Sequence, residues 1–187
     1  MSKLKLKKEL ERMSPEHLRE LLLDLYDARK EAKEYLEFYI NPDAAKIIER
    51  YAKVIDREGE RARRGRRFRT TICSKAIKDF SSYGAGAEYE AQLMTRALDA
   101  ALHVTASRYT DTIDRWSEKT FADMLARLYS AGLLDTSLAA VKRLIERYRV
   151  ARHPAAQRFA EAFAEYYPDE TIPKESLLGR IAKAIGR

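Results

Sequence analysis

The sequence predicts an all-α fold, and three observations support this prediction. Ala, Leu, Glu, Lys and Arg are plentiful whereas Val and Ile are sparse, a balance that favours helix over strand. Only seven glycines and five prolines interrupt the 187 residues. Apolar residues recur at spacings of three and four, and no segment alternates convincingly between apolar and polar residues. We therefore expect a single domain of seven to nine helices in a helical-hairpin or bundle-like array.

Composition and length predict a globular core in residues 1–167 and a basic amphipathic tail in residues 168–187. The chain is 45% hydrophobic and 35% charged, which is typical of globular proteins, and it is long enough for one proper core. The tail follows a proline and places apolar residues at helical spacing opposite basic ones. These residues are Leu177, Leu178, Ile181 and Ile185, opposite Arg180, Lys183 and Arg187.

The strongest helical pattern follows a short first helix that spans about residues 4–13. Ser14 is a good capping residue, and Pro15 suits the first position of a helix. An apolar stripe then continues as far as Ile40. Pro42 disfavours helical geometry in the residue before it, so the pattern predicts that the helix ends there.

A continuous helix from Pro15 to Ile40 would be about 39 Å long and would form the spine of the fold. Its apolar residues also fit the heptads of a coiled coil. However, Ala28 and Ala32 lie at its centre, and small residues favour close packing against another helix of the same chain. We therefore expect both alanines to be buried.

Six further helices are expected, each bounded by a capping residue, a glycine or a proline. The fifth helix of the chain is apolar over much of its circumference, so it is predicted to be central. The six helices run from Asp43 to the point where Gly59 and the arginines after it weaken or end the helix, Thr71 to Phe80, Glu88 to Ser107, Ile113 to Gly132, from a cap at Asp135 or Thr136, and from His153-Pro154 to before Pro168.

This layout resembles a family of small bacterial helical proteins classed as a domain of unknown function. The resemblance implies an all-helical fold and carries over no activity, cofactor or catalytic residue. The similar stretches are Leu25-Tyr26-Asp27, Lys33-Glu34-Tyr35-Leu36-Glu37-Phe38-Tyr39-Ile40-Asn41-Pro42-Asp43, Lys75-Ala76-Ile77-Lys78-Asp79-Phe80 and Gly132-Leu133-Leu134-Asp135.

The residues that could support catalysis do not form a recognised motif, so no catalytic residue, metal site or cofactor is predicted. Arg96, Asp99 and His103 share one face of a predicted helix, which fits a carboxylate-oriented imidazole but also an ordinary polar network. Cys73 has cations nearby that could lower its pKa, yet single cysteines are more often small core residues. Neither the His-Glu-x-x-His motif nor a glycine-rich phosphate loop is present.

One charged segment, which we call the arginine stretch, points towards a partner. Residues Arg57–Arg69 contain seven arginines and two glutamates and so carry +5 of the chain's net charge of +7. Guanidinium groups bind phosphate and stack on bases, and an aromatic ring within the stretch adds a stacking surface. The alternative is a solvated helix end whose arginines pair with nearby glutamates. The candidate residues for binding a nucleic acid or another anion are Arg61, Arg63, Arg64, Arg66, Arg67, Phe68 and Arg69.

Three classes of function therefore remain open. The first is a non-catalytic helical interaction protein with a protein partner, and the second binds RNA, DNA or another polyanion without regard to sequence. The third is an enzyme whose site the sequence does not reveal. A lone cysteine fits a reducing cytoplasm, and no apolar run approaches the roughly 20 residues that span a bilayer, so we expect a cytoplasmic protein without a transmembrane segment.

Overall fold

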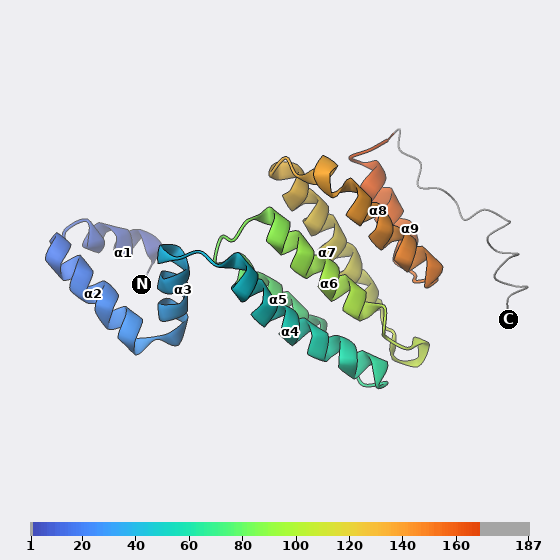
Figure 1. The fold of residues 1–187 in the computed structure, drawn as a ribbon, viewed down its shortest axis with the longest axis horizontal. Coiled ribbons are helices and arrows are strands. Elements are labelled where there is room, and N and C mark those ends of the chain that lie inside the picture. Colours follow the sequence, from blue (N-terminus) through green and yellow to red (C-terminus); the bar gives the residue numbers. More distant parts are fainter. Residues whose placement is uncertain (1, 169–187) are drawn as a thin grey trace, which may run out of the picture. The chain divides into compact units, whose positions relative to one another are not determined.

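The computed structural model describes residues 2–168, and it is built from helices (Figure 1). Within these residues there are nine α-helices and one short 3-10 helix, and no strand is present. The predicted all-α class and the predicted number of helices are confirmed. The predicted basic tail lies almost entirely outside the described residues.

The chain divides into two compact units, Met1–Lys46 and Ile47–Arg187. The N-terminal unit contains α1 (Lys3–Leu10), α2 (Pro15–Ala28) and α3 (Lys30–Ile40). Ser14 caps α2 as predicted, because its side chain accepts a hydrogen bond from the backbone N–H of His17 at 3.3 Å, and Pro15 takes the first helical position.

The predicted continuous spine from Pro15 to Ile40 is wrong, because Arg29 breaks it into two helices. Arg29 has extended backbone angles (φ −136°, ψ 116°), and α3 packs against α2. The Tyr26 hydroxyl donates a hydrogen bond to Glu37 at 3.0 Å, and the Lys33 ammonium lies 4.9 Å from the centre of the Tyr26 ring. A straight helix would leave its whole apolar stripe in water, whereas the break lets α2 and α3 cover part of it.

The two central alanines of the predicted spine are not buried. Ala28 is exposed and Ala32 is only half-buried. None of the residues of α1, α2 and α3 is fully buried. The expectation that these alanines pack closely against another helix is therefore wrong.

The second unit consists of the remaining helices. Asp43 caps the first of them as predicted, since its side chain accepts a hydrogen bond from the backbone N–H of Lys46 at 2.9 Å. Predicted and observed ends differ most at the fifth helix of the sequence prediction, which ends near residue 101 rather than 107. The helices are α4 (Ala44–Arg63), α5 (Thr70–Ser81), α6 (Ala87–Ala101), α7 (Asp111–Ser130), α8 (Leu134–Val150) and α9 (Ala156–Ala164), with the 3-10 turn η1 (Ala106–Arg108).

The α6 helix is central in this unit, as its composition predicts. It packs against α5 and α7, and α7 in turn packs against α8 and α9 (Figure 1). The rings of Phe121 and Phe159 stack with their centres 4.1 Å apart, and the buried Tyr148 hydroxyl donates to the Leu98 carbonyl at 2.8 Å. These contacts join α6, α7, α8 and α9 around one apolar core.

Three turns in this unit reverse the chain by the same device. After α7, Gly132 has a positive φ of 68°, its N–H donates to the Tyr129 carbonyl, and the next N–H donates to the Leu128 carbonyl. This Schellman geometry confirms the predicted helix end at Gly132. Arg152 takes the equivalent position after α8 with φ 53°, where glycine is the usual residue. The third such turn follows α4.

The sequence analysis expected Gly59 and the arginines after it to weaken or end this helix, and α4 passes through Gly59 and ends at Arg63 within the arginine stretch. A glycine fits at position 59 because α6 lies close to α4 at this point. A Cβ atom at position 59 would lie 3.2 Å from the Ala100 Cβ of α6. The absence of a side chain therefore allows α4 and α6 to approach closely, and Gly59 is buried in this contact.

We predict that Gly59→Leu destabilises the second unit by about 1–3 kcal/mol, because a leucine would force apart two helices that already touch. Thermal and denaturant unfolding measure this change. Arg57→Leu is the matched control, since it adds the same side chain at an exposed position of the same helix. Equal stability of the two variants would contradict the close contact between α4 and α6.

Candidate functional site

The arginine stretch forms the last turns of α4 and the connection to α5. After α4 ends at Arg63, Gly65 adopts φ 66°. Its N–H donates to the Ala62 carbonyl at 2.9 Å, and the N–H of Arg66 donates to the Arg61 carbonyl at 2.8 Å. This is again a Schellman turn, and the left-handed position explains why a glycine interrupts the arginines. The stretch therefore has a defined backbone geometry.

A buried carboxylate fixes the end of the stretch. The Glu58 side chain is 2% exposed and lies on the inner side of α4. It accepts hydrogen bonds from the Arg69 guanidinium, including Nε at 3.1 Å, and from the Arg69 backbone N–H at 3.3 Å. The Arg61 Nε lies 3.7 Å from the same carboxylate. A carboxylate removed from water needs such partners, and its hydrogen bonds raise the pKa of Arg69.

The structure places Phe68 in the core rather than on a binding surface. Its side chain is 3% exposed, and its ring and that of Trp116 form a T-shaped pair with the ring centres 5.7 Å apart. The Trp116 indole N–H donates to the Ser74 hydroxyl at 2.8 Å. The prediction that Phe68 offers a face for stacking bases is therefore wrong, because that ring holds the connection onto the core.

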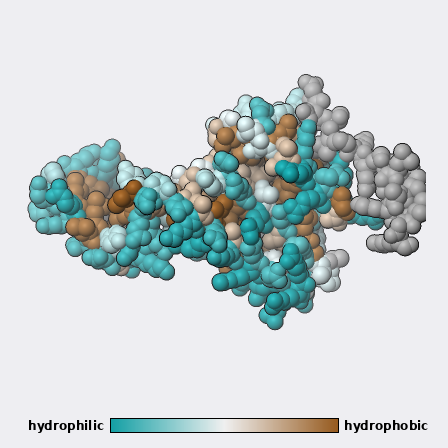
Figure 2. All heavy atoms as spheres, viewed as in Figure 1, coloured by the Kyte–Doolittle hydropathy of each residue, from teal (hydrophilic) through white to brown (hydrophobic). Residues whose placement is uncertain are grey.

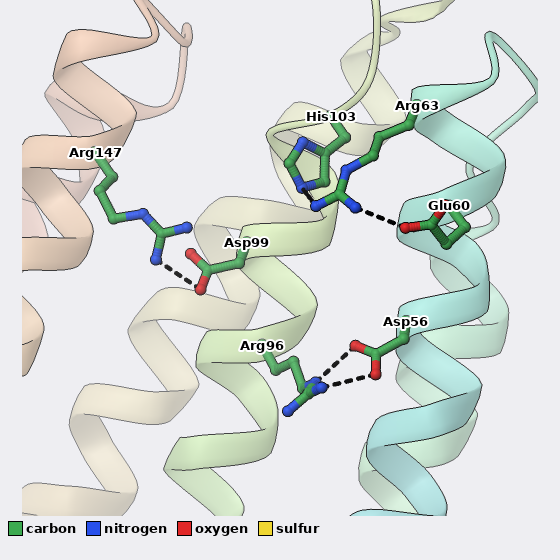
Figure 3. Close-up of polar contacts among 7 residues, drawn as sticks. All are labelled: Asp56, Glu60, Arg63, Arg96, Asp99, His103 and Arg147. Atoms are coloured by element: carbon green, nitrogen blue, oxygen red, sulfur yellow. Dashed lines mark hydrogen bonds and ion pairs between the residues drawn. The ribbon is translucent and has the colours of Figure 1, made fainter.

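Arg63 contacts two side chains from separate segments of the chain (Figure 3). It donates to Glu60 of α4 at 2.6 Å and to the His103 Nε2, just beyond α6, at 2.8 Å. Since a guanidinium only donates hydrogen bonds, this His103 nitrogen is an acceptor and carries no proton. Burial and the nearby Arg63 lower the pKa of His103, which agrees with a neutral ring.

Four arginines of the stretch remain available to a partner. They are exposed, and among residues 2–168 their side chains have no hydrogen bond or ion pair: Arg57, Arg64, Arg66 and Arg67. Three of the four follow the last turns of α4, where the helix dipole also favours cations. Of the predicted candidates, the structure thus leaves Arg64, Arg66 and Arg67 free, and it adds Arg57, which the sequence analysis did not select.

The predicted group of Arg96, Asp99 and His103 does not form a catalytic pair. Arg96 makes two hydrogen bonds to Asp56 of α4, at 2.6 and 2.7 Å, and Asp99 accepts one from Arg147 of α8 at 2.7 Å (Figure 3). Burial raises the pKa of Asp99 despite this arginine. Each polar group is thus used to join α6 to a neighbouring helix, which is the polar-network interpretation.

Cys73 is a core residue and not an activated nucleophile. Its side chain is fully buried on the inner face of α5, and burial raises the pKa of its thiol to about 12. A thiol reacts as its thiolate, so this environment suppresses its chemistry. Across residues 2–168, no three His, Cys, Asp or Glu side chains converge in a way that could hold a metal ion.

A shallow hollow of about 390 Å³ lies between α6 and α7. Its two charged residues, Glu90 and Arg127, are paired with each other, and Arg127 also donates to Ser81 at 3.3 Å. The rest of its lining is small: Ala87, Ala126, Ser130 and Ala131. The charged groups are therefore already satisfied within the protein.

A second candidate surface is an apolar face on the N-terminal unit, where the sequence analysis selected no site residue. Figure 2 shows hydrophobic atoms gathered on the helices of this unit. Of the twelve exposed large hydrophobic residues within residues 2–168, ten belong to the first 46 residues. We call these ten the apolar face: Leu4, Leu6, Met13, Leu21, Leu22, Leu23, Leu25, Tyr35, Tyr39 and Ile40.

The sequence contains one signal for this face. Leu21, Leu22, Leu23 and Leu25 are too closely spaced to share one side of a helix, so some of them had to point away from α3. The apolar residues around Tyr35 and Tyr39 are likewise too closely spaced to lie on one side of their helix. From the sequence alone, the aromatic segment from Tyr35 to Tyr39 fits a binding patch and burial between two layers of helices equally well.

A comparison with protein families now adds to this geometry. The model of a family of unknown function, DUF6155, matches residues 1–132. The chain belongs to this family. The match confirms the predicted resemblance to a domain of unknown function, and no curated protein and no solved structure matches the chain.

The DUF6155 match includes both candidate surfaces and ends at the turn after α7. The helices α8 and α9 lie beyond it, although they supply buried core residues such as Tyr148, Phe159 and Phe163. In the described part of the chain, no helix has both the length and the apolar character needed to span a bilayer.

We predict that the second unit loses stability as the pH falls below about 6.5, the ordinary value of histidine. The lowered pKa values of His103 and His153 mean that the unfolded chain binds protons before the folded chain does. The raised pKa of Asp99 acts in the opposite direction, but at lower pH.

His103→Gln tests the share of this effect that comes from the contact with Arg63. The variant is expected to lose less stability than wild type between about pH 7.5 and 5.5, by under about 1 kcal/mol because the ring is partly solvated. Unfolding in denaturant at each pH measures the change. His17→Gln, at an exposed position of α2, is the control, and a wild-type slope in H103Q would contradict the neutral His103.

Proposed function

We propose that this protein is a non-catalytic helical interaction protein, and that the apolar face of the N-terminal unit receives its partner. The observation that supports this is the concentration of exposed large hydrophobic residues in the first 46 residues. Monomeric proteins rarely expose contiguous apolar surface of this kind unless it meets another molecule. The second unit, in contrast, buries its apolar residues in one core.

The polar groups of the second unit support a structural rather than a catalytic role. Perturbed pKa values often mark an active site, but here each has a structural cause. Asp99 joins α6 to α8, His103 accepts from Arg63, and Cys73 fills the core. An enzyme would need reactive groups aimed at a shared space, whereas these three groups lie in separate structural contacts.

The proposal includes a cellular setting. The resemblance of the sequence to small bacterial proteins favours a bacterial origin. Cys73 is buried and has no cysteine partner, which fits a reducing compartment. We therefore place the interaction in the cytoplasm.

We predict that a photoreactive p-benzoylphenylalanine at position 22 forms a covalent adduct with a second polypeptide in cells that express the full chain. Leu22 is 50% exposed and belongs to the apolar face, so a partner docked there would lie within reach. Tyr129 is the control position, because it is exposed on the second unit and outside the face. Denaturing electrophoresis after irradiation measures the adduct. Equal or absent adducts at both positions would argue against the proposed function.

The free arginines favour a second candidate function, the binding of a polyanion. Arg64, Arg66 and Arg67 surround a turn whose backbone is fixed by hydrogen bonds, and Glu58 holds the end of the stretch in place. A backbone that is already ordered loses less conformational freedom when its side chains meet phosphate. Since Phe68 is buried, the contacts would be to the backbone of a nucleic acid and indifferent to its sequence.

We predict that the triple variant Arg64→Gln, Arg66→Gln, Arg67→Gln lowers the salt dependence of nucleic-acid binding. The slope of log K against log salt should fall by about 0.9 per arginine on duplex DNA and about 0.7 on single strands. Titration of RNA and DNA at several salt concentrations measures it. The fold is expected to survive, because these side chains have no partner within the described residues.

The matched control removes three exposed cations elsewhere in the second unit, by Lys78→Gln, Lys119→Gln and Arg143→Gln. If the arginine stretch is the specific site, the slope of log K against log salt falls only in the arginine variant and not in the control. Absence of binding at low salt, or the same loss in both variants, would rule out the arginine stretch as a polyanion site.

A further inference from the structure

We infer that the partner of the apolar face is a second copy of this chain, which pairs through the N-terminal unit. This inference rests on the interaction function proposed above and names its partner. Two properties of residues 1–46 lead to it: an apolar surface that the unit cannot cover by itself, and charges of opposite sign on different helices.

The N-terminal unit is too small to hide its apolar residues. Its helices have 8, 14 and 11 residues, and helices of this length are marginal in water unless they pack against other elements. Tyr39 and Ile40 are 75% and 80% exposed, and the run from Leu21 to Leu23 is exposed along α2. A second copy presents an equal apolar surface, so pairing would cover both at once.

The charges of this unit are separated between its helices. The α1 helix contains four lysines and one glutamate, a net charge of +3. Residues 15–40, which contain α2 and α3, carry four basic and seven acidic side chains, a net charge of −3. The two charges are equal and opposite, so the surface complements itself.

These charges are available for an external contact. In the described residues, Lys3, Lys5 and Lys8 of α1 have no ion-pair partner, and the same holds for Glu20 and Asp24 of α2. In a two-fold symmetric contact, α1 of one copy can face α2 of the other, and the favourable pairing then occurs twice. Any other partner would need both an apolar surface and this charge pattern, which a second copy has by construction.

The test is a charge exchange between two variants of the full chain. The first carries Lys5→Glu and Lys8→Glu, and the second carries Glu20→Lys and Asp24→Lys. In a homodimer of either variant, like charges face each other at both contacts, which should weaken dimerisation about 100-fold or more. In a mixture of the two variants, both contacts regain opposite charges.

Sedimentation equilibrium gives the masses, and circular dichroism reports the helix content of each variant. We expect wild type at twice the chain mass of 21.6 kDa, each variant alone near the single mass, and the equimolar mixture again at twice that mass. Recovery in the mixture also excludes unfolding as the reason for the loss. Lys78→Glu with Lys119→Glu, at exposed positions of the second unit, is the control and should remain dimeric.

Each other result overturns the inference. Wild type at the single mass, or variants that dimerise as tightly as wild type, would show that the apolar face does not pair with itself. If the adduct from position 22 then has a mass other than twice that of the chain, the interaction function stands and the partner is a different protein. If no adduct forms either, the proposed function fails with it.

Discussion

The buried carboxylate of Glu58 is the constraint on which the arginine stretch depends. A charge removed from water must find hydrogen-bond donors, and Glu58 takes them from the side chain and backbone of Arg69, with Arg61 close by. Because residue 69 is held there, the connection from α4 to α5 passes over the core and inserts Phe68 against Trp116. The arginines between these anchors are left outside. A single buried acid thus separates the structural arginines from the free ones.

The two units treat apolar surface differently, and their sizes explain why. The described part of the second unit has six helices of 9 to 20 residues, and α6 at its centre buries eight residues. The N-terminal unit has three short helices, and none of their residues is buried. Buried area rises with the size of a unit, so 46 residues leave much of their apolar surface in water. Association with another molecule is the ordinary way in which such a unit gains the missing burial.

Local signals in the sequence predicted the positions of the helices well. The features that the sequence analysis did not predict depend on packing between residues far apart in the chain. Ser14 and Gly132 act on neighbouring backbone atoms, so their roles as cap and terminator were predictable. No glycine or proline marks the break at Arg29, so the sequence contains no local signal for it. The break accompanies the packing of α3 against α2. Glycine disfavours helix, yet Gly59 lies within α4, where the absence of a side chain leaves room for Ala100 of α6. The burial of Phe68 was unpredictable for the same reason, because its partner Trp116 is 48 residues away in the chain.

The two candidate surfaces rest on forces that salt affects in opposite ways. Burial of the apolar face gains from the hydrophobic effect, which salting-out ions strengthen, whereas contacts of the free arginines with phosphate weaken as salt rises. The surfaces would nevertheless reinforce each other if both act. A dimer carries two copies of the arginine turn, so a polyanion that reaches both binds the second with a high effective concentration. Pairing through the N-terminal unit would therefore bring two clusters of free arginines into one assembly, where a polyanion that contacts both is held more tightly than by one.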